Sequence, residues 1–241
     1  MRKDIHNSDV PELCRACEAR HQGICGSLDA DQLRELAKDA TRREVAAGTE
    51  LIASEEQVAT YASIMSGVVK LSKLLADGRR QIVGLQFAPD FLGRPFKNDG
   101  QLNAEAATPV RLCVFTKRTI DRMLKASPQL EHQILEQTLR ELDEARDWMV
   151  TLGRKNAKEK VASFLLMVAT CFEPEHSLED DGPVRFELPM TRADIADFLG
   201  LTIETTSRQL TRLRRDGVIE VEHNREVTIL DTEALRHRSG E

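Results

Sequence analysis

The chain is poor in aromatic residues and has no long apolar run. Aromatic residues make up 4% of its 241 residues, with one tryptophan and one tyrosine. A membrane span needs roughly 20 consecutive apolar residues, and the longest apolar stretch, Phe164–Thr170, is far shorter. The N-terminus has no apolar run of signal-peptide length. We therefore expect a cytoplasmic protein with no membrane partner.

An excess of positive charge is also absent. The formal net charge is −6, which excludes a uniformly basic nucleic-acid coat protein but allows a local basic patch, because net charge does not report its distribution. The sequence has no Gly-rich phosphate loop, no H-E-x-x-H motif and no G-x-S-x-G motif. Its six histidines are scattered without paired spacing. We therefore do not expect an enzyme.

Patterns that are present divide the chain into four expected domains. Residues 1–30 are polar and hold three of the five cysteines. Short strand patterns separated by turn residues dominate residues 31–126, which is typical of a sandwich or barrel. Asp77-Gly78 predicts a hairpin between two of these strands. Residues 127–156 and 157–241 are the other two domains. The expected strands are Val45–Ile52, Tyr61–Val69, Lys70–Leu75, Gln81–Phe87 and Val110–Phe115.

A helical period begins after Ser127-Pro128 and continues to about residue 155. Apolar or small residues recur there at alternating spacings of three and four, which is the pattern of a heptad seam. The seam predicts either an amphipathic helix packed on its own domain or a helix that pairs with its copy in a dimer. Thr138 and Ala145 are weak core residues, so the seam would be marginal and suits a switchable dimer. The seam residues are Leu135, Thr138, Leu142, Ala145, Met149 and Leu152.

The C-terminal stretch predicts a helix-turn-helix followed by a wing. After a helix over Ala157–Cys171, a polar loop over Glu173–Pro183 and a strand over Val184–Leu188, two short helices over Thr191–Phe198 and Thr202–Arg215 flank Gly200. A hairpin of two strands, Val218–Val221 and Val227–Leu230, follows them. The second short helix carries four arginines against one acid, a local charge of +3.

Three residues of that helix are candidates for reading DNA bases. Glu204 and Arg208 lie four residues apart, so both face one side of the helix, and Ser207 lies beside them. Arginine pairs with guanine and glutamate accepts from cytosine. Taken alone, Glu204 and Arg208 fit a surface ion pair better than a DNA contact; the flanking helix, the Gly turn, the Thr cap and the hairpin reverse that preference. Candidate phosphate contacts, each of which also fits a plain solvated residue, are Arg192, Thr202, Thr205, Arg212, His223 and Arg225.

Four cysteines form a candidate metal site. Cys14, Cys17 and Cys25 have the pattern C-x2-C-x7-C, and Cys113 follows in an expected strand. In a reducing compartment such cysteines are metal ligands more often than disulfides. The spacing fits both a structural zinc site and an iron–sulfur cluster. Cys171 lies in the apolar run FLLMVATCF, and we expect it to be a buried core thiol.

The residues Glu204-Thr205-Thr206-Ser207-Arg208 match the E-x-x-S-R signature of the FNR branch of the CRP/FNR family of bacterial transcription regulators, and the resemblance covers nearly the whole chain. It implies an α+β fold with an N-terminal β-roll, a long dimerisation helix and a C-terminal winged helix-turn-helix. It also implies that Glu204, Ser207 and Arg208 read TTGAT half-sites of a palindrome. Cys113 lies where the family's fourth cluster ligand falls, while the x7 gap differs from the best-known x5 pattern and resembles FnrL-type members.

The same resemblance implies a 4Fe–4S cluster on Cys14, Cys17, Cys25 and Cys113, one per subunit. It implies that the intact cluster promotes homodimerisation and binding to double-stranded DNA at low oxygen, with RNA polymerase as a further partner. A regulator with a structural zinc site or a different redox or nitric oxide signal is the alternative. Cyclic-nucleotide binding is not expected, because Phe91-Leu92-Gly93-Arg94 has arginine where such sensors need glutamate.

Overall fold

The computed structural model describes residues 10–240 except 16, 53–58, 96–101 and 173–181. Its contacts divide the chain into two compact units, residues 1–73 with 83–143 and residues 74–82 with 144–241. The four domains expected from the sequence are a finer division, which remains a prediction. Among the described residues, no helix combines the length and the apolar character that crossing a bilayer requires.

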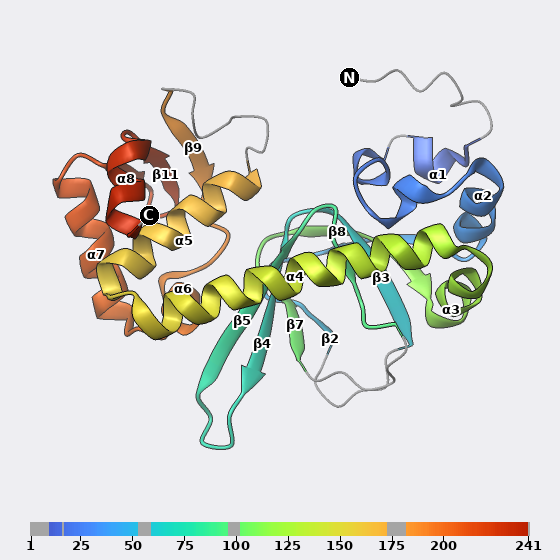
Figure 1. The fold of residues 1–241 in the computed structure, drawn as a ribbon, viewed down its shortest axis with the longest axis horizontal. Helices are drawn as coiled ribbons and strands as arrows, with labels where there is room; N and C mark the ends of the chain where they lie inside the picture. Colours follow the sequence, from blue (N-terminus) through green and yellow to red (C-terminus); the bar gives the residue numbers. More distant parts are fainter. Residues whose placement is uncertain (1–9, 16, 53–58, 96–101, 173–181, 241) are drawn as a thin grey trace. The chain divides into compact units, whose positions relative to one another are not determined.

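Two four-stranded sheets form the β-roll (Figure 1), which belongs to the first unit except for residues 74–82. The first sheet has the order β1-β8-β3-β6 and the second the order β2-β7-β4-β5, and the neighbouring strands whose register is known are antiparallel. The strands are β1 (Thr41–Val45), β2 (Glu50–Ile52), β3 (Thr60–Ser66), β4 (Val68–Leu74), β5 (Arg80–Phe87), β6 (Phe91–Leu92), β7 (Asn103–Ala106) and β8 (Val110–Thr116).

Three of the five expected strands, Lys70–Leu75, Gln81–Phe87 and Val110–Phe115, are confirmed to within two residues at each end, and the other two are corrected. The run Val45–Ile52 was wrong as a single strand, because a turn with Gly48 at φ +81° separates β1 from β2. The run Tyr61–Val69 is likewise divided at Gly67, whose φ is +90°. The Asp77-Gly78 hairpin between β4 and β5 is confirmed. Strands β6 and β7 are short and were not expected.

Short helices cover the end of the roll that carries the N-terminal cysteines. Asp29 caps the helix after them with a capping box, and Thr116 caps the helix after β8 by accepting from the Thr119 N–H. Their apolar faces share one core cluster with Tyr61, Phe91 and Phe115. These elements are α1 (Glu12–Arg15), the single turns η1 (Glu18–Arg20) and η2 (Ile24–Ser27), α2 (Ala30–Lys38) and α3 (Lys117–Ala126).

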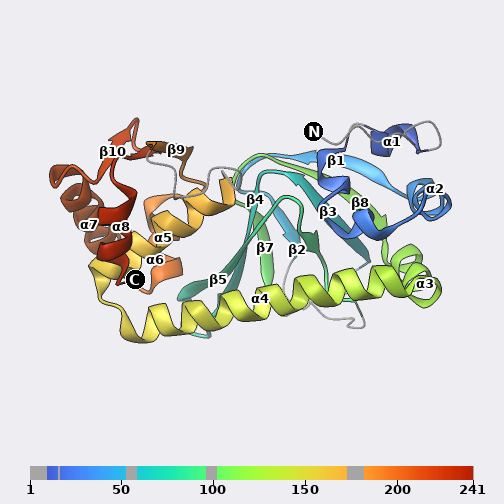
Figure 2. The same ribbon diagram turned by 45° about the horizontal axis from the view of Figure 1, so that its top comes forward.

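The long helix α4 (Pro128–Arg154) confirms the helical period of the sequence (Figure 2). It begins at Pro128, whose fixed φ suits the first turn of a helix. Gln137, on its buried face, exchanges two hydrogen bonds with the backbone of Phe91: the Phe91 N–H donates to Oε1 (2.9 Å) and Nε2 donates to the Phe91 carbonyl (3.1 Å). The first half of α4 is thereby attached to strand β6 of the roll.

The second unit is a winged helix-turn-helix, as the sequence predicts (Figure 1). Gly200, in the left-handed conformation (φ +62°), ends α6, and Thr202 caps α7. The three-stranded sheet has the order β10-β11-β9. Helix α8 was not expected. The elements are α5 (Ala157–Phe172), β9 (Val184–Glu187), α6 (Arg192–Leu199), α7 (Ile203–Arg215), β10 (Ile219–Glu222), β11 (Glu226–Ile229) and α8 (Thr232–Ser239).

One prediction about this unit was wrong. Cys171 was expected in the core, but it is exposed. The helix α5 is buried along most of its length from Val161 to Ala169, and its last turn leaves the core, so that Phe172 is also 41% exposed. The polar loop expected over Glu173–Pro183 lies mostly outside the described residues.

Candidate cysteine centre and DNA interface

All four predicted ligand cysteines line one cavity in the first unit. Cys14 lies on α1, Cys17 between α1 and η1, Cys25 on η2, and Cys113 on β8. Each is partly buried. The rest of the lining is mostly apolar and includes Ile24, which is 2% exposed. The structure therefore brings together cysteines that are far apart in the sequence: Cys14 and Cys113 are separated by 99 positions.

Single turns with two glycines shape the chain around Cys25. Gly23 donates to the Ala19 carbonyl and Gly26 to the Gly23 carbonyl. A Cβ atom at Gly23 would lie 2.8 Å from the Pro89 carbonyl oxygen, and one at Gly26 would lie 2.9 Å from the His21 carbonyl oxygen. Because both contacts are with backbone atoms, a side chain at either position would displace the segment that carries Cys25.

The fourth cysteine lies in a row across three strands. Cys113 on β8 pairs with Arg42 on β1 and with Ser63 on β3. Residues directly opposite each other in antiparallel strands share a face of the sheet. Arg42 also donates to the carbonyl of Leu13, the residue before Cys14. This hydrogen bond attaches the N-terminal segment to the strand beside Cys113.

Burial raises the pKa of three of these thiols and so keeps Cys14, Cys25 and Cys113 protonated in the absence of a metal. It raises the pKa of Cys113 to about 12, and the neighbouring Cys14 and Cys17 add to the effect. Burial also raises the pKa of Cys25 and of Cys14. Thiolates in such a wall need compensating positive charge, which a bound metal centre supplies. The protein itself supplies one positive charge at the cavity, the guanidinium of Arg20, which is 6% exposed and lines the cavity.

The chemistry of the lining fits an iron–sulfur cluster. Four thiols are the donor set that such clusters use. The Arg20 guanidinium opposes the negative charge of a thiolate-bound cluster. The Ser63 hydroxyl is a buried polar atom without a hydrogen-bond partner among the described residues, and it faces the cavity with a donor to offer.

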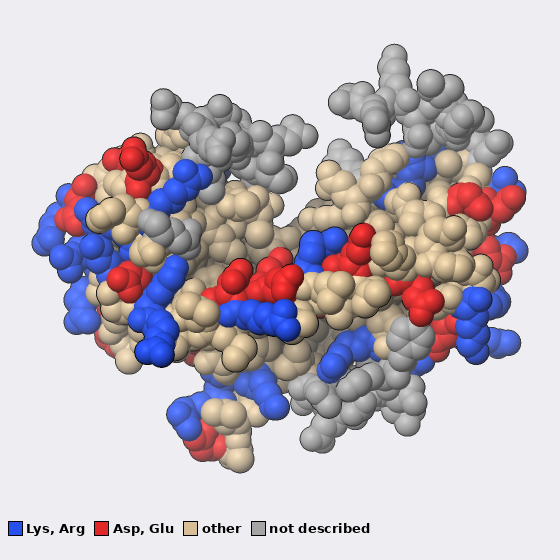
Figure 3. Space-filling model, in the orientation of Figure 1, with Lys and Arg blue, Asp and Glu red and all other residues tan. Residues whose placement is uncertain are grey.

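The predicted base-reading residues lie on the accessible side of α7. Glu204 and Arg208 are exposed and Ser207 is partly so, whereas Thr206, Leu210 and Leu213 are buried. The backbone N–H of Glu204 and the Thr202 hydroxyl lower the pKa of the Glu204 carboxyl, which is therefore an ionised acceptor at neutral pH. Lys and Arg side chains gather on the surface where α7 lies (Figure 3).

The predicted phosphate contacts lie on three elements, with different surroundings. Arg212 is exposed on α7, and Thr202 donates its hydroxyl to Thr205 at the start of that helix. Arg192 on α6 donates to the Asn224 carbonyl in the wing turn. Arg225 lies 3.6 Å from Glu187. All of these side chains belong to the second unit.

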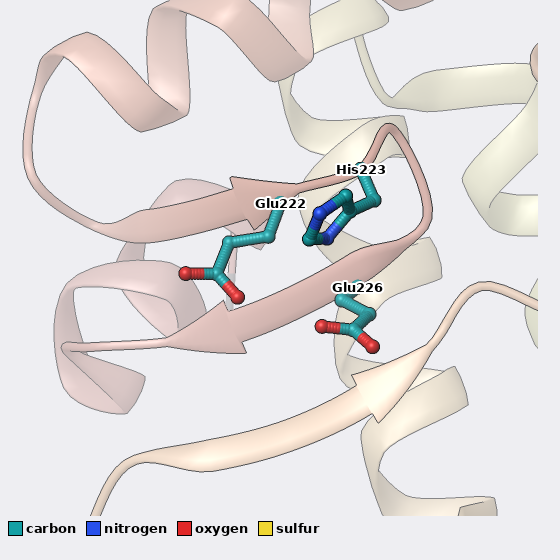
Figure 4. A group of neighbouring side chains, drawn as sticks. All are labelled: Glu222, His223 and Glu226. Carbon is teal, nitrogen blue, oxygen red and sulfur yellow. The ribbon is translucent and has the colours of Figure 1, made fainter.

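The sixth candidate, His223, lies at the tip of the wing with φ +48°. Its ring lies among the carboxylates of Glu222 and Glu226, and the three ligand atoms are within 4.8 Å of one another (Figure 4). Sequence reasoning did not single out this group. Arg185 donates to both carboxylates, at 3.1 and 2.7 Å, so an exposed ion-pair network accounts for the cluster.

The predicted dimer seam is an exposed stripe of α4. Leu135 is 52% exposed, Leu142 44% and Met149 73%. Thr138 and Ala145 are exposed between them, and Leu152 is partly buried. Sequence reasoning missed Leu139 and Val150, which are 50% and 59% exposed and widen the stripe. Leu139 follows Thr138 and Val150 follows Met149, so each is an apolar residue directly after a seam position. An apolar residue next to the seam is the signal that would have identified both.

Comparisons with known proteins define the class of the chain. Residues 42–127 match the family model described as a cyclic nucleotide-binding domain, and residues 159–238 match the Crp-like helix-turn-helix domain. The chain is 50% identical to a probable transcriptional activator of Rhizobium leguminosarum bv. viciae, over 97% of this chain and 96% of the relative. The chain therefore belongs to the CRP/FNR family of transcription regulators, and the predicted fold class is confirmed.

Two further comparisons place it within that family. It is 39% identical to the transcriptional activator protein FnrL of Cereibacter sphaeroides, over 97% of this chain and 95% of the relative. The solved structure of FixK2 from Bradyrhizobium japonicum matches with a TM-score of 0.73 and 30% identity, covering 83% of this chain and 96% of that one. The relatives are regulators by name, which agrees with the expectation that the chain is not an enzyme.

Proposed function

We propose that this protein is an oxygen-responsive transcription regulator. In this proposal a 4Fe–4S cluster bound by Cys14, Cys17, Cys25 and Cys113 favours the homodimer and its binding to TTGAT-type palindromes at low oxygen. The observation that carries the proposal is the meeting of all four cysteines at one cavity. The likeness to FnrL and to regulators named transcriptional activators supports it.

The residues of the chain have a defined part in this response. When bound, a 4Fe–4S cluster supplies an oxygen-labile centre with four sulfur bonds to the protein. Three of these bonds come from the segment that includes α1 and η2, and one comes from β8. The four cysteines therefore hold the N-terminal segment on the sheet, and Arg42 reinforces that attachment through the Leu13 carbonyl. A bound centre then biases the chain between two states.

Metal analysis of protein purified without air tests the cofactor. We expect about four iron and four acid-labile sulfide per chain in the wild type, and the same in Cys171→Ser, whose thiol is exposed on α5. Cys113→Ser should lose most of both while its circular dichroism shows a folded chain. One zinc per chain without sulfide would refute the cluster and support the alternative of a structural zinc site.

The exposed stripe of α4 supports a second copy of this chain as its partner. Large apolar side chains such as Met149 rarely stay this exposed on a regular helix, and repeated at heptad spacing they match a coiled-coil seam. Leu142→Glu should shift the cluster-loaded protein from dimer to monomer in sedimentation at micromolar concentration. Asp147→Ala, an exposed residue of the same helix outside the stripe, should leave the dimer intact. Equal behaviour of the two variants would contradict this interface.

The accessible side of α7 supports base reading by Glu204, Ser207 and Arg208. Arg208→Ala should weaken binding to a TTGAT palindrome by about 1–3 kcal/mol, or about 5- to 150-fold, and relax the preference for that sequence. Arg214→Ala is the matched control, because Arg214 is an exposed arginine of the same helix outside the predicted contacts. Mobility-shift titrations at fixed salt measure both. A specificity ratio that Arg208→Ala leaves unchanged would contradict the assignment.

The candidate phosphate contacts and the polymerase contact complete the proposal. Each lost phosphate contact should weaken binding on all sequences alike and reduce the salt dependence by about one counterion, which Arg212→Ala tests.

Activation through RNA polymerase rests on the names of the relatives. Transcription from a TTGAT promoter with purified polymerase, with and without air, tests it. Addition of a cyclic nucleotide should change neither binding nor transcription.

A further inference from the structure

The wall of the cysteine cavity contains one buried hydroxyl that the fold itself does not use. Ser63 is 7% exposed, and its Oγ has no hydrogen-bond partner among the described residues. A buried polar atom left without a partner costs about 1–3 kcal/mol. Strand β3 pairs with its neighbours through main-chain atoms, so alanine at position 63 would keep that pairing. The chain nevertheless has a serine there, and the fold bears the cost of its unpaired hydroxyl.

The place of Ser63 connects it with the fourth cysteine. Ser63 on β3 lies directly opposite Cys113 on β8, so both side chains project from the same face of the sheet. Both also line the cavity, together with the apolar side chains of Met65 and Phe115. A hydroxyl in this position can donate to sulfur, which is the acceptor that the cavity offers.

We infer that Ser63 is a positioning residue that donates a hydrogen bond to a sulfur atom of the metal centre on the Cys113 side. The inference rests on the proposed function and adds a residue that motif reasoning does not reach. Hydrogen bonds to the sulfurs of a cluster stabilise its reduced, more negative state and set its potential. Residues beyond the direct ligands typically change metal retention by about 10- to 100-fold.

The test compares Ser63→Ala with Ser63→Thr in protein purified without air. Ser63→Ala removes the donor and should shift the midpoint potential of the cluster to a more negative value. It should also release iron to a chelator about tenfold faster than the wild type. Ser63→Thr keeps the hydroxyl and should restore both properties. Ser72→Ala, a serine that is 4% exposed on β4 of the other sheet, is the matched control and should behave as the wild type.

Unfolding of the cluster-free protein separates this role from plain packing. Under the inference, Ser63→Ala leaves the cluster-free chain as stable as the wild type or more stable, because an unpaired buried hydroxyl is removed. Destabilisation of the cluster-free chain that equals the loss in the loaded chain would mean a structural role and overturn the inference. So would an unchanged potential and iron release in Ser63→Ala. A wild type that holds no iron overturns the proposed function as well, which distinguishes the two failures.

Discussion

The two hydrogen bonds between Gln137 and Phe91 lead to a prediction that can be worked through in energy. Replacing Gln137 by leucine keeps the volume of the side chain but removes both partners of the Phe91 backbone. Phe91 is 2% exposed and Gln137 is 8% exposed, so water does not readily take the place of the amide. The change therefore leaves one N–H and one carbonyl of strand β6 unpaired.

Each hydrogen bond contributes about 1 kcal/mol net, and each stranded buried group costs about 1–3 kcal/mol. The added apolar burial of leucine offsets part of this loss. We expect Gln137→Leu to lower the free energy of unfolding by about 2–4 kcal/mol. That is a large share of the 5–15 kcal/mol that is typical of a domain.

Urea unfolding at one fixed protein concentration measures the effect, because association would otherwise add to the apparent stability. Far-UV circular dichroism follows the whole chain, and the fluorescence of Trp148, the single tryptophan, follows the second unit. Gln133→Leu is the matched control: within the described part of the chain its amide donates to Glu136 on the same helix, and it should change stability by less than about 0.5 kcal/mol. A loss below about 1 kcal/mol in Gln137→Leu would refute the reasoning.

Two further predictions concern pH and backbone geometry. Burial raises the pKa of Asp90 to about 6, so the folded chain holds this proton more tightly than the unfolded chain, and stability falls by about 2–3 kcal/mol as the pH rises from about 4 to 6. Asp90→Asn should flatten this fall and be more stable at pH 8 in urea titrations; an unchanged pH profile would contradict it. Gly67→Ala places a Cβ 2.3 Å from the Pro109 carbonyl oxygen at φ +90°, whereas Gly78→Ala meets open space at φ +86°. Both substitutions cost the strain of a positive φ, about 1 kcal/mol, and Gly67→Ala should lose clearly more in thermal unfolding; equal losses would contradict the contact.

Local signals explain why the DNA-binding half of the fold was predictable. The Thr caps at 191 and 202, the left-handed Gly200 and the apolar positions Ile195 and Leu210 all act within a few residues of each other. Helix α8 was missed because its eight residues bury only Leu235 and Ser239 and therefore carry almost no periodic pattern.

Non-local contacts explain the rest. Strands β6 and β7 have two and four residues, too few to show an alternating pattern, and they form through pairing with β3, β2 and β4. The spacing of Cys14, Cys17 and Cys25 indicated a metal site, but neither it nor periodicity could show that Ser63 and Arg42 flank Cys113. That row depends on which strands become neighbours, a property of the whole sheet. Cys171 was misplaced because an apolar run does not show where a helix leaves the core.

The strand order of the first sheet determines when, during synthesis of the chain, the four cysteines can come together. Strand β1 pairs only with β8 among the described strands, and β8 lies between β1 and β3. The row that holds Cys113 therefore cannot assemble until β8 has left the ribosome, 88 residues after Cys25. At about 5–20 residues per second, the three N-terminal thiols wait for roughly 4–18 s before their fourth partner is even synthesised. The proposed centre on all four cysteines can therefore be completed only after Cys113 of β8 has been made, at a point where 128 residues of the chain are still to be synthesised.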